Sequence, residues 1–367
     1  MMSWEDNVRK VTPYTAGEQP KGRVIKLNTN ENPYPPSPMV ATRIYDLAQQ
    51  ELDGVTSMLR KYPDMDAVPL VDAIVRVYNE QYFPQGDGLT FDNVFAGVGS
   101  DDVLFTAFMT FFNSDKPIIF PDITYSFYDV WAQVHRFPYR MIPLKDDFSI
   151  DINDYLDTEN GGIVIANPNA PTGEYLDPAE LEKIVKANPD SVVIIDEAYI
   201  DFGGESCLPF IKKYDNVLIV QTFSKSRSLA GLRIGTAFGD EKLIRYLKDI
   251  KFSINSYTMN YPAIELATVA VLDTEYFNET VKRVIKTREW TKEKLKELGF
   301  IFGDSKTNFI FARHEKISGE EIFAKLRERQ IYVRHWNKPR ISEYLRISIG
   351  TDEDMKELIK ALGEIVK

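Results

Sequence analysis

The chain has 367 residues, of which 44% are hydrophobic, and its formal net charge is −11. This length favours two domains, and the acidic balance argues against a broad nucleic-acid surface. A single cysteine, Cys207, allows no intrachain disulfide and fits a reducing compartment; the charged first ten residues and the short apolar runs predict a cytoplasmic protein without a membrane partner.

Residues 1–38 are predicted to form an irregular N-terminal arm, because residues 11–38 are rich in Pro, Gly and Asn. From residue 39 helical periodicity alternates with short apolar runs, which predicts a large domain over 39–258. Nearly continuous apolar strands alternating with helices indicate an α/β fold with a mostly parallel sheet covered on both faces. The expected strands lie at 93–100, 117–121, 137–144, 162–168, 191–199, 216–224 and 233–239, and the expected helices at 39–53, 66–82, 101–112 and 178–188.

The pattern changes after about residue 255, and residues 259–367 are predicted to form a smaller α+β domain. Its expected elements are a long amphipathic region at 262–298, strands at 308–313, 331–335 and 344–350, a helix at 318–329 and a closing helix from 352.

The stretch GVGSDD, residues 97–102, stands where the first strand runs into a helix. Its two glycines let the backbone come close to an anion, and Ser100 together with the first N–H groups of the helix can donate hydrogen bonds to it. A glycine turn with Ser100 as the helix N-cap would give the same pattern without a ligand. This stretch alone leaves both interpretations open.

Asp196 follows the apolar run VVII, so its carboxylate is expected at the end of a buried strand. A buried charge requires a partner. That partner is either an ion pair or a cap within the protein, or a protonated ring nitrogen of a ligand. Tyr199, three residues further on, can hydrogen-bond a phenolic oxygen of the same ligand.

The segment QTFSKSRSLAGLRIG, residues 221–235, surrounds Lys225 with hydroxyl residues and glycines. A lysine on a solvated surface needs no such neighbours, whereas an amine that forms a Schiff base must be neutral to react. Ser224 and Arg233 suit a phosphate group, the arginine as a planar fork. Taken alone, Lys225 also fits an ordinary surface lysine.

Pyridoxal phosphate requires this whole set: a lysine for its aldehyde, a carboxylate for its pyridinium nitrogen and donors for its phosphate. The three features occur together at expected strand ends, where ligand loops of such sheets lie. We therefore predict pyridoxal phosphate as the cofactor. The three histidines show no metal-ligand spacing, and no metal site is expected.

In combination, the motifs resemble those of fold-type I, aspartate-aminotransferase-like enzymes, and more closely those of the histidinol-phosphate aminotransferase family. The resemblance covers nearly the whole chain. It implies three catalytic residues: Lys225 carries the cofactor and moves the substrate α-proton, Asp196 pairs with the ring nitrogen, and Tyr199 pairs with the ring oxygen. The stretches that carry the resemblance are VTPYTAG, KLNTNENPYPPSP, RKYPD, GVGSDD, NPNAPTG, DEAY, TFSKSRSLAGLRIG and YLRISIGT.

The resemblance also implies residues that hold the cofactor. Tyr125 in PDITYSFYD would stack on its ring, although an ordinary core aromatic would fit the same position. Tyr62 in RKYPD would reach the phosphate of the neighbouring subunit's cofactor, which implies a homodimer with shared active sites. The residues expected around the phosphate are Gly99, Ser100, Asp101, Thr222, Ser224 and Arg233.

One position departs from the family pattern. Many members have an asparagine directly before Pro-Thr-Gly, where it hydrogen-bonds the ring oxygen of the cofactor; here that residue is Ala170, with Asn169 before it. Either Asn169 takes over, or Tyr199 suffices, or the electronics of the ring are altered. Asn169 is therefore a further candidate for cofactor binding.

Four residues are candidates for binding substrate. Arg334 and Arg346 match the family's pair of anion-binding arginines; a strand-edge cation would also explain Arg334, whereas the apolar strand around Arg346 makes an unpaired arginine there costly. Tyr14 resembles the arm tyrosine that closes over a substrate phosphate. Asn255 lies at the expected joint between the domains.

The activity implied by the resemblance is transfer of an amino group from histidinol phosphate to 2-oxoglutarate in histidine biosynthesis, giving glutamate by ping-pong kinetics through Lys225. An aromatic amino-acid aminotransferase on the same scaffold and a lyase similar to threonine-phosphate decarboxylases are the alternatives. A non-catalytic protein of this fold is disfavoured, because Lys225, Asp196 and Arg233 are all present.

Overall fold

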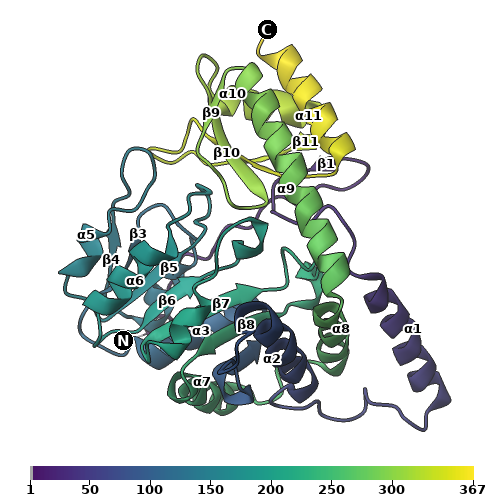
Figure 1. The fold of residues 1–367 in the computed structure, drawn as a ribbon. Helices are drawn as coiled ribbons and strands as arrows, with labels where there is room; N and C mark the ends of the chain where they lie inside the picture. Colours follow the sequence, from purple (N-terminus) through teal and green to yellow (C-terminus); the bar gives the residue numbers. More distant parts are fainter. Residues whose placement is uncertain (1–2) are drawn as a thin grey trace.

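The computed structural model describes residues 3–367 as a mixed α/β structure with a large part, a small part and an N-terminal arm (Figure 1). The large part is built on a seven-stranded sheet with the order β2-β8-β7-β6-β5-β3-β4. Neighbouring strands are parallel except where β8 pairs with β2 and β7, so the expected mostly parallel sheet is confirmed. The strands are β2 (Val94–Gly97), β3 (Ile118–Pro121), β4 (Tyr139–Ile142), β5 (Gly162–Ala166), β6 (Val193–Asp196), β7 (Val217–Thr222) and β8 (Gly235–Gly239).

Helices cover both faces of this sheet, which explains why its inner strands are apolar throughout. In β6, Val193 and Ile195 pack into the core shared with α2, α6 and α8, whereas Ile194 packs into the core shared with α3, α4 and α7. Each such side chain contributes roughly 1.5–3 kcal/mol when fully buried. The helices are α2 (Val68–Tyr82), α3 (Gly99–Phe111), α4 (Tyr128–His135), α5 (Asn153–Leu156), α6 (Pro178–Ala187), α7 (Glu241–Ile254) and α8 (Tyr261–Leu272). Among residues 3–367, no helix has both the length and the apolarity needed to cross a membrane.

The small part holds a four-stranded antiparallel sheet with the order β12-β13-β10-β9, on which three helices pack. Its long helix α9 runs from beside α8 up to the small sheet, and so joins the two parts (Figure 1). The elements are α9 (Thr274–Glu297), β9 (Phe300–Phe302), β10 (Phe309–His314), α10 (Gly319–Glu328), β11 (Ile331–Tyr332), β12 (Arg334–His335), β13 (Leu345–Ser348) and α11 (Asp352–Ile365).

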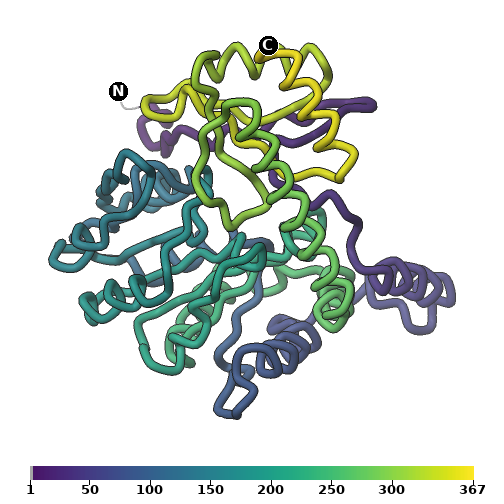
Figure 2. Tube along the Cα trace, turned by 45° about the horizontal axis from the view of Figure 1, so that its top comes forward, coloured from purple at the N-terminus to yellow at the C-terminus, as the bar shows by residue number. Residues whose placement is uncertain are grey.

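The N-terminal arm is held more tightly than its composition suggests. Its short strand β1 (Ile25–Lys26) pairs in parallel with β11, which ties the arm to the small part. The chain then enters α1 (Pro38–Asp53), where Ser37 caps the first turn and Gly54, at φ 69°, ends the helix. Figure 2 shows α1 at the margin of the molecule, away from both sheets.

Two expected elements are divided in the structure. The amphipathic region 262–298 forms two helices, because Asp273 ends α8 and its side chain caps α9 by accepting a hydrogen bond from the Tyr276 N–H. The expected strand 331–335 belongs to two sheets: β11 pairs with the arm, and β12 pairs with β13. The helix division is set locally by the Asp273 cap, whereas the strand division depends on partners that are distant in sequence, which local periodicity does not report.

Helix α8 packs with the large part, although the expected domain boundary would assign it to the small part. Ala263, Ile264 and Ala267 belong to the core of the large sheet, whereas the core of the small part takes Val281 and Val284 from α9. The division expected at residue 258 remains a prediction. We propose that the boundary lies instead near the start of α9.

Candidate active site

Two cavities meet at the carboxyl ends of β5, β6 and β7. The smaller cavity, about 180 Å³, lies between these strand ends and the start of α3. The larger cavity, about 470 Å³, opens between the large part, the small part and the arm. The residues that line both are Thr29, Tyr125, Ala170, Tyr199 and Lys225. Such crevices beyond the carboxyl ends of parallel strands are where α/β sheets bind ligands.

Lys225 stands where the two cavities join. It lies three residues beyond the end of β7, and its Nζ donates a long hydrogen bond of 3.4 Å to the Thr29 carbonyl. The ammonium also lies 5.7 Å from the centre of the Tyr199 ring. It forms no ion pair with a carboxylate of residues 3–367. The amine therefore faces the cavities and is only half-buried, unlike a solvated surface lysine.

Asp196 is the last residue of β6 and is 4% exposed. One carboxylate oxygen accepts a hydrogen bond of 2.7 Å from the Tyr128 hydroxyl and the other accepts one of 3.2 Å from the Ala198 N–H. Burial raises the pKa of Asp196 to about 6, although these hydrogen bonds act to lower it. No cation of the described chain forms an ion pair with it, so this largely ionised carboxylate lines the smaller cavity without a countercharge.

The opposite end of the smaller cavity is lined by hydroxyl groups and a guanidinium. Arg233 lies 3.3 Å from an Asp101 carboxylate oxygen and 3.5 Å from the Ser224 hydroxyl. The Thr222 hydroxyl donates to the Ser224 oxygen over 3.0 Å, and Ser100 also lines this end. A planar guanidinium beside several hydroxyls suits a phosphate group.

Gly99 shapes this end of the cavity through its backbone. It has φ +84°, and a Cβ added there would lie 2.7 Å from an Arg233 nitrogen, so a larger residue would displace the guanidinium. Gly99 is the first residue of α3, with Val98 at the N-cap position and no side-chain cap. Ser100 is therefore not an N-cap, and the free N–H groups of this helix end lie beside the cavity.

Two tyrosines line the boundary between the cavities. The Tyr199 hydroxyl accepts a hydrogen bond of 2.9 Å from the Asn30 side chain. The Tyr125 hydroxyl donates a hydrogen bond of 2.7 Å to an Asp101 carboxylate oxygen. Burial and the adjacent Asp101 charge raise the pKa of Tyr125 well above its ordinary value, so this phenol is neutral at physiological pH.

The Asn169 side chain is fully engaged by neighbouring residues of the protein. Its carbonyl oxygen accepts a hydrogen bond from Thr124, and its NH₂ group donates to the Ile123 carbonyl and the Thr172 hydroxyl. It is absent from the lining of both cavities, whereas Ala170 lines both. The side chain thus holds its own loop, and its role in cofactor binding remains a prediction.

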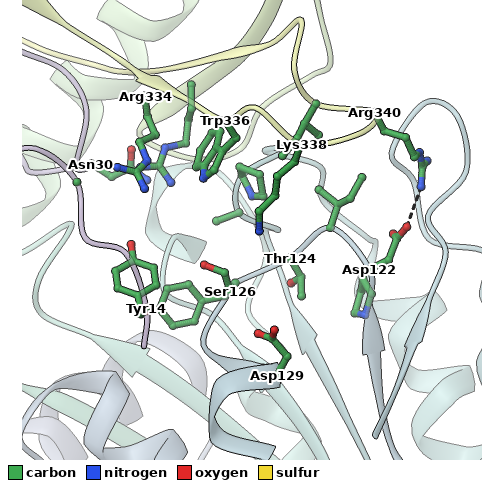
Figure 3. Close-up of a pocket in the computed structure, with 18 of the residues that line it drawn as sticks. Tyr14, Asn30, Asp122, Thr124, Ser126, Asp129, Arg334, Trp336, Lys338 and Arg340 are labelled. Carbon is green, nitrogen blue, oxygen red and sulfur yellow. Dashed lines mark hydrogen bonds and ion pairs between the residues drawn. The ribbon is translucent and has the colours of Figure 1, made fainter. Parts of the chain in front are cut away.

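The expected substrate residues of the small part do line the larger cavity. Arg346 is partly buried and donates from one Nη to the Asn28 carbonyl over 3.0 Å, while its Nε is buried without a partner among the described residues. Burial lowers the pKa of Arg346 from its usual value. Arg334 donates to the carbonyls of Thr15 and Ala16 in the arm. Figure 3 shows Arg334 and Tyr14 on the same side of this cavity.

Two further candidates are absent from the lining of both cavities. Asn255 is exposed at the C-cap of α7, so this chain alone does not bring it to the site. Tyr62 is 80% exposed between α1 and α2, and its ring stacks on Tyr257 with centroids 4.6 Å apart. The structure of one chain therefore places neither residue beside Lys225.

Several functional contacts were missed by sequence reasoning. Asn30 is bonded to Tyr199, Asn32 donates to the carbonyls of Lys225 and Ser226, and Tyr128 donates to Asp196. The clustered asparagines of NTNEN, residues 28–32, were a usable signal, since buried amides need partners. Tyr128 had no such signal, because its target is 68 residues away.

Comparisons with known proteins agree with this geometry. Residues 22–362 match the family described as aminotransferase class I and II. A histidinol-phosphate aminotransferase from Lactococcus lactis subsp. cremoris is 50% identical to the chain over 367 residues, which are 100% of this chain and 98% of the relative. A histidinol-phosphate aminotransferase from Clostridium acetobutylicum is 50% identical over 364 residues, which are 99% of each protein. The crystal structure of the histidinol-phosphate aminotransferase from Sinorhizobium meliloti in complex with pyridoxal-5'-phosphate has the same fold, with a TM-score of 0.82 at 22% identity, covering 94% of this chain and 90% of that one.

The fold and the lysine at the junction of two cavities thus define an enzyme of the aminotransferase class, class I and II. The 50% identity to the relative from Lactococcus lactis over the full length is far above the 22% identity to the crystal structure that has the same fold. The chain belongs to the histidinol-phosphate aminotransferase family.

Proposed function

We propose that the protein transfers the amino group of histidinol phosphate to 2-oxoglutarate, with pyridoxal phosphate as cofactor. The observation that carries this proposal is the position of Lys225, which lines one cavity with Asp196 and another with Arg346. One cavity suits an aromatic cofactor with a phosphate tail, and the other suits an anionic substrate. The relatives at 50% identity bear the name of this activity.

The residues of the smaller cavity fit the cofactor from end to end. Asp196 offers an unpaired carboxylate for a ring nitrogen, and Arg233 with Ser100, Thr222 and Ser224 offers donors for a phosphate. Tyr125 would lie against the ring and Tyr199 would donate to its oxygen. When bound, the cofactor supplies an electron sink that stabilises negative charge at the substrate α-carbon.

The chain's own groups would hold and move the protons. Lys225 would hold the cofactor, and its amine, once free, would act as the general base that takes the α-proton from the substrate. The Asp196 carboxylate would keep a ring nitrogen of the cofactor protonated, and the Tyr128 hydroxyl, which donates to it, would hold it in orientation. Asn30 orients the Tyr199 hydroxyl through its side-chain amide.

Anion binding in the larger cavity would fall to the small part and the arm. Arg346 has an unused buried Nε, so a carboxylate or phosphate that reached it would satisfy a donor that otherwise costs free energy. Arg334 is held by arm carbonyls close to Tyr14, so both would act on the same end of the substrate. Histidinol phosphate and glutamate both offer anions for these groups.

A panel of amino donors tested with 2-oxoglutarate as acceptor examines the proposed substrate. We expect kcat/KM for histidinol phosphate to exceed that for histidinol by about 100-fold or more, because each charge-assisted hydrogen bond to the phosphate contributes about 1.5–3 kcal/mol. Equal use of histidinol and its phosphate ester would contradict the assignment. A preference for phenylalanine or tyrosine would support the aromatic alternative, and carbon dioxide release from threonine phosphate would support a lyase.

Replacing Arg346 with alanine should raise KM for glutamate about 10- to 100-fold, because the variant loses charge-assisted hydrogen bonds to a carboxylate. Arg346→Lys should recover little, since an ammonium cannot form the planar two-point contact. Steady-state kinetics of both variants would be compared with Arg76→Ala, which removes an exposed arginine from α2. An unchanged KM in Arg346→Ala would show that the guanidinium does not bind the carboxylate.

We also propose that two copies of the chain share their active sites, in the cytoplasm. The exposed face of α1 and the following loop carries apolar side chains, among them Tyr45, Leu52, Val55 and Leu59. Tyr62 lies in the same exposed region, far from its own Lys225 site, so it would serve the partner's cofactor. A solution mass equal to one chain would argue against this arrangement.

A further inference from the structure

We propose that Asp129 is a specificity residue that accepts a hydrogen bond from the imidazole ring of the substrate. This inference rests on the proposed function and extends it to the end of the substrate that carries no phosphate. Asp129 is the second residue of α4 and lines the larger cavity. Figure 3 shows its carboxylate facing the cavity from the side opposite to Lys338 and Arg334.

The charges around the larger cavity are unevenly distributed. The small part contributes the cations Arg334, Lys338, Arg340 and Arg346, which suit an anionic group. The large part contributes the two carboxylates of the lining, Asp122 and Asp129. A substrate that fits this arrangement carries an anion at one end and a hydrogen-bond donor at the other.

Only one of these two carboxylates is free to bind a ligand. Asp122 forms an ion pair with Arg340 at 2.9 Å, and its other oxygen accepts a hydrogen bond from the Leu144 N–H. For the Asp129 carboxylate no hydrogen bond or ion pair is found with any of residues 3–367. The Ser126 hydroxyl, which lines the same wall and is visible beside Asp129 in Figure 3, is likewise without a side-chain partner in this part of the chain.

The position of Asp129 is set by the cofactor cavity itself. The preceding residue, Tyr128, is fully buried and its hydroxyl is bonded to Asp196. Trp131, one turn along α4, is also buried. Because α4 is anchored on both sides of Asp129, the carboxylate has little freedom to move relative to the reacting end of the site.

Imidazole is the ring that matches this wall. Each neutral tautomer has one N–H donor and one acceptor nitrogen, so Asp129 can accept from the first and Ser126 can donate to the second. A phenyl ring has neither group and would leave the carboxylate desolvated without a hydrogen bond. Sites built to hydrogen-bond a substrate group discriminate against analogues that lack the group. Asp129 would therefore favour histidinol phosphate over substrates with a hydrocarbon ring.

The test compares histidinol phosphate with the phosphate ester of phenylalaninol, which keeps the amine and the phosphate but lacks ring nitrogens. We expect the unaltered enzyme to prefer histidinol phosphate and Asp129→Ala to lose about 10- to 100-fold of that preference in kcat/KM. Asp129→Asn keeps one acceptor oxygen, so its preference should lie between those of the unaltered enzyme and Asp129→Ala. The glutamate half-reaction should be unchanged in both variants, because glutamate has no ring.

Asp115→Ala serves as the matched control, because it removes an exposed carboxylate outside both cavities. The proposal is overturned if Asp129→Ala keeps the preference, or if it lowers turnover of both esters and of glutamate equally, which would indicate a structural role. If the unaltered enzyme turns over neither ester but accepts other amino donors, the proposed function itself fails. If it uses both esters equally well, only the role of Asp129 fails.

Discussion

Replacing Lys225 with alanine should abolish transamination, lowering kcat by about 10⁴-fold or more, because the variant loses both the covalent amine and the general base. The structure offers no substitute: Lys225 is the only lysine of the described chain that lines both cavities. Lys338 lines the larger cavity alone and reaches it from the small part. Single-turnover and steady-state assays with glutamate would measure the loss.

Two companion variants make this result specific. Lys225→Arg keeps a positive charge but cannot bind the cofactor covalently, so it should be as inactive as the alanine variant. Lys242→Ala removes an exposed lysine from the start of α7 and should behave like the unaltered enzyme. The absorbance of lysine-bound cofactor should be lost in both Lys225 variants. Retention of that absorbance in Lys225→Ala would mean that another amine carries the cofactor.

Replacing Asp196 with asparagine should lower kcat by about 10³-fold or more, since an amide cannot hold a ring nitrogen in its protonated form. The shape and most hydrogen bonds are kept, because the Tyr128 hydroxyl can accept from the new NH₂ group. Lys225 is unaltered, so the absorbance of bound cofactor should persist while turnover is lost. Near-normal turnover would contradict the role of the carboxylate.

The same substitution should stabilise the cofactor-free protein. The pKa of Asp196 is about 6 in the folded protein against an ordinary value of 3.8, so the folded state binds the proton more tightly than the unfolded state does. Stability therefore falls as the pH rises from about 4 to 6, and at neutral pH the carboxylate lowers the free energy of unfolding by up to about 3 kcal/mol. Thermal unfolding of cofactor-free Asp196→Asn at pH 7 should show a higher Tm.

Glu197 provides the matched control for Asp196. It is the next residue along the chain and is also buried, but it lines neither cavity. Its carboxylate accepts hydrogen bonds from the Ser206 hydroxyl, the Cys207 N–H and the Gln221 amide. Glu197→Gln should alter thermal stability while leaving turnover close to that of the unaltered enzyme. Equal loss of turnover in both variants would show that any disturbance at this strand end is enough to lower turnover.

The type of fold and the main chemical groups of the site follow from the sequence alone. Apolar runs such as VVII mark strands buried on both faces, and they end at Asp196 because a charge cannot continue such a run. Lys225, Ser224 and Arg233 lie on one short segment, so their proximity followed from chain connectivity. The family resemblance could also be stated from these motifs, and the full-length relatives confirm it.

The hydrogen-bond partners of these groups depend on the folded chain. Asn30 reaches Tyr199 across 169 residues of sequence, and Tyr128 reaches Asp196 across 68. The use of Asn169 within its own loop, the burial of the Arg346 Nε and the free carboxylate of Asp129 likewise depend on which chain segments pack together. Periodicity and composition report the local environment along one segment, whereas hydrogen-bond partners and cavity walls are set by contacts between segments that only the folded chain brings together.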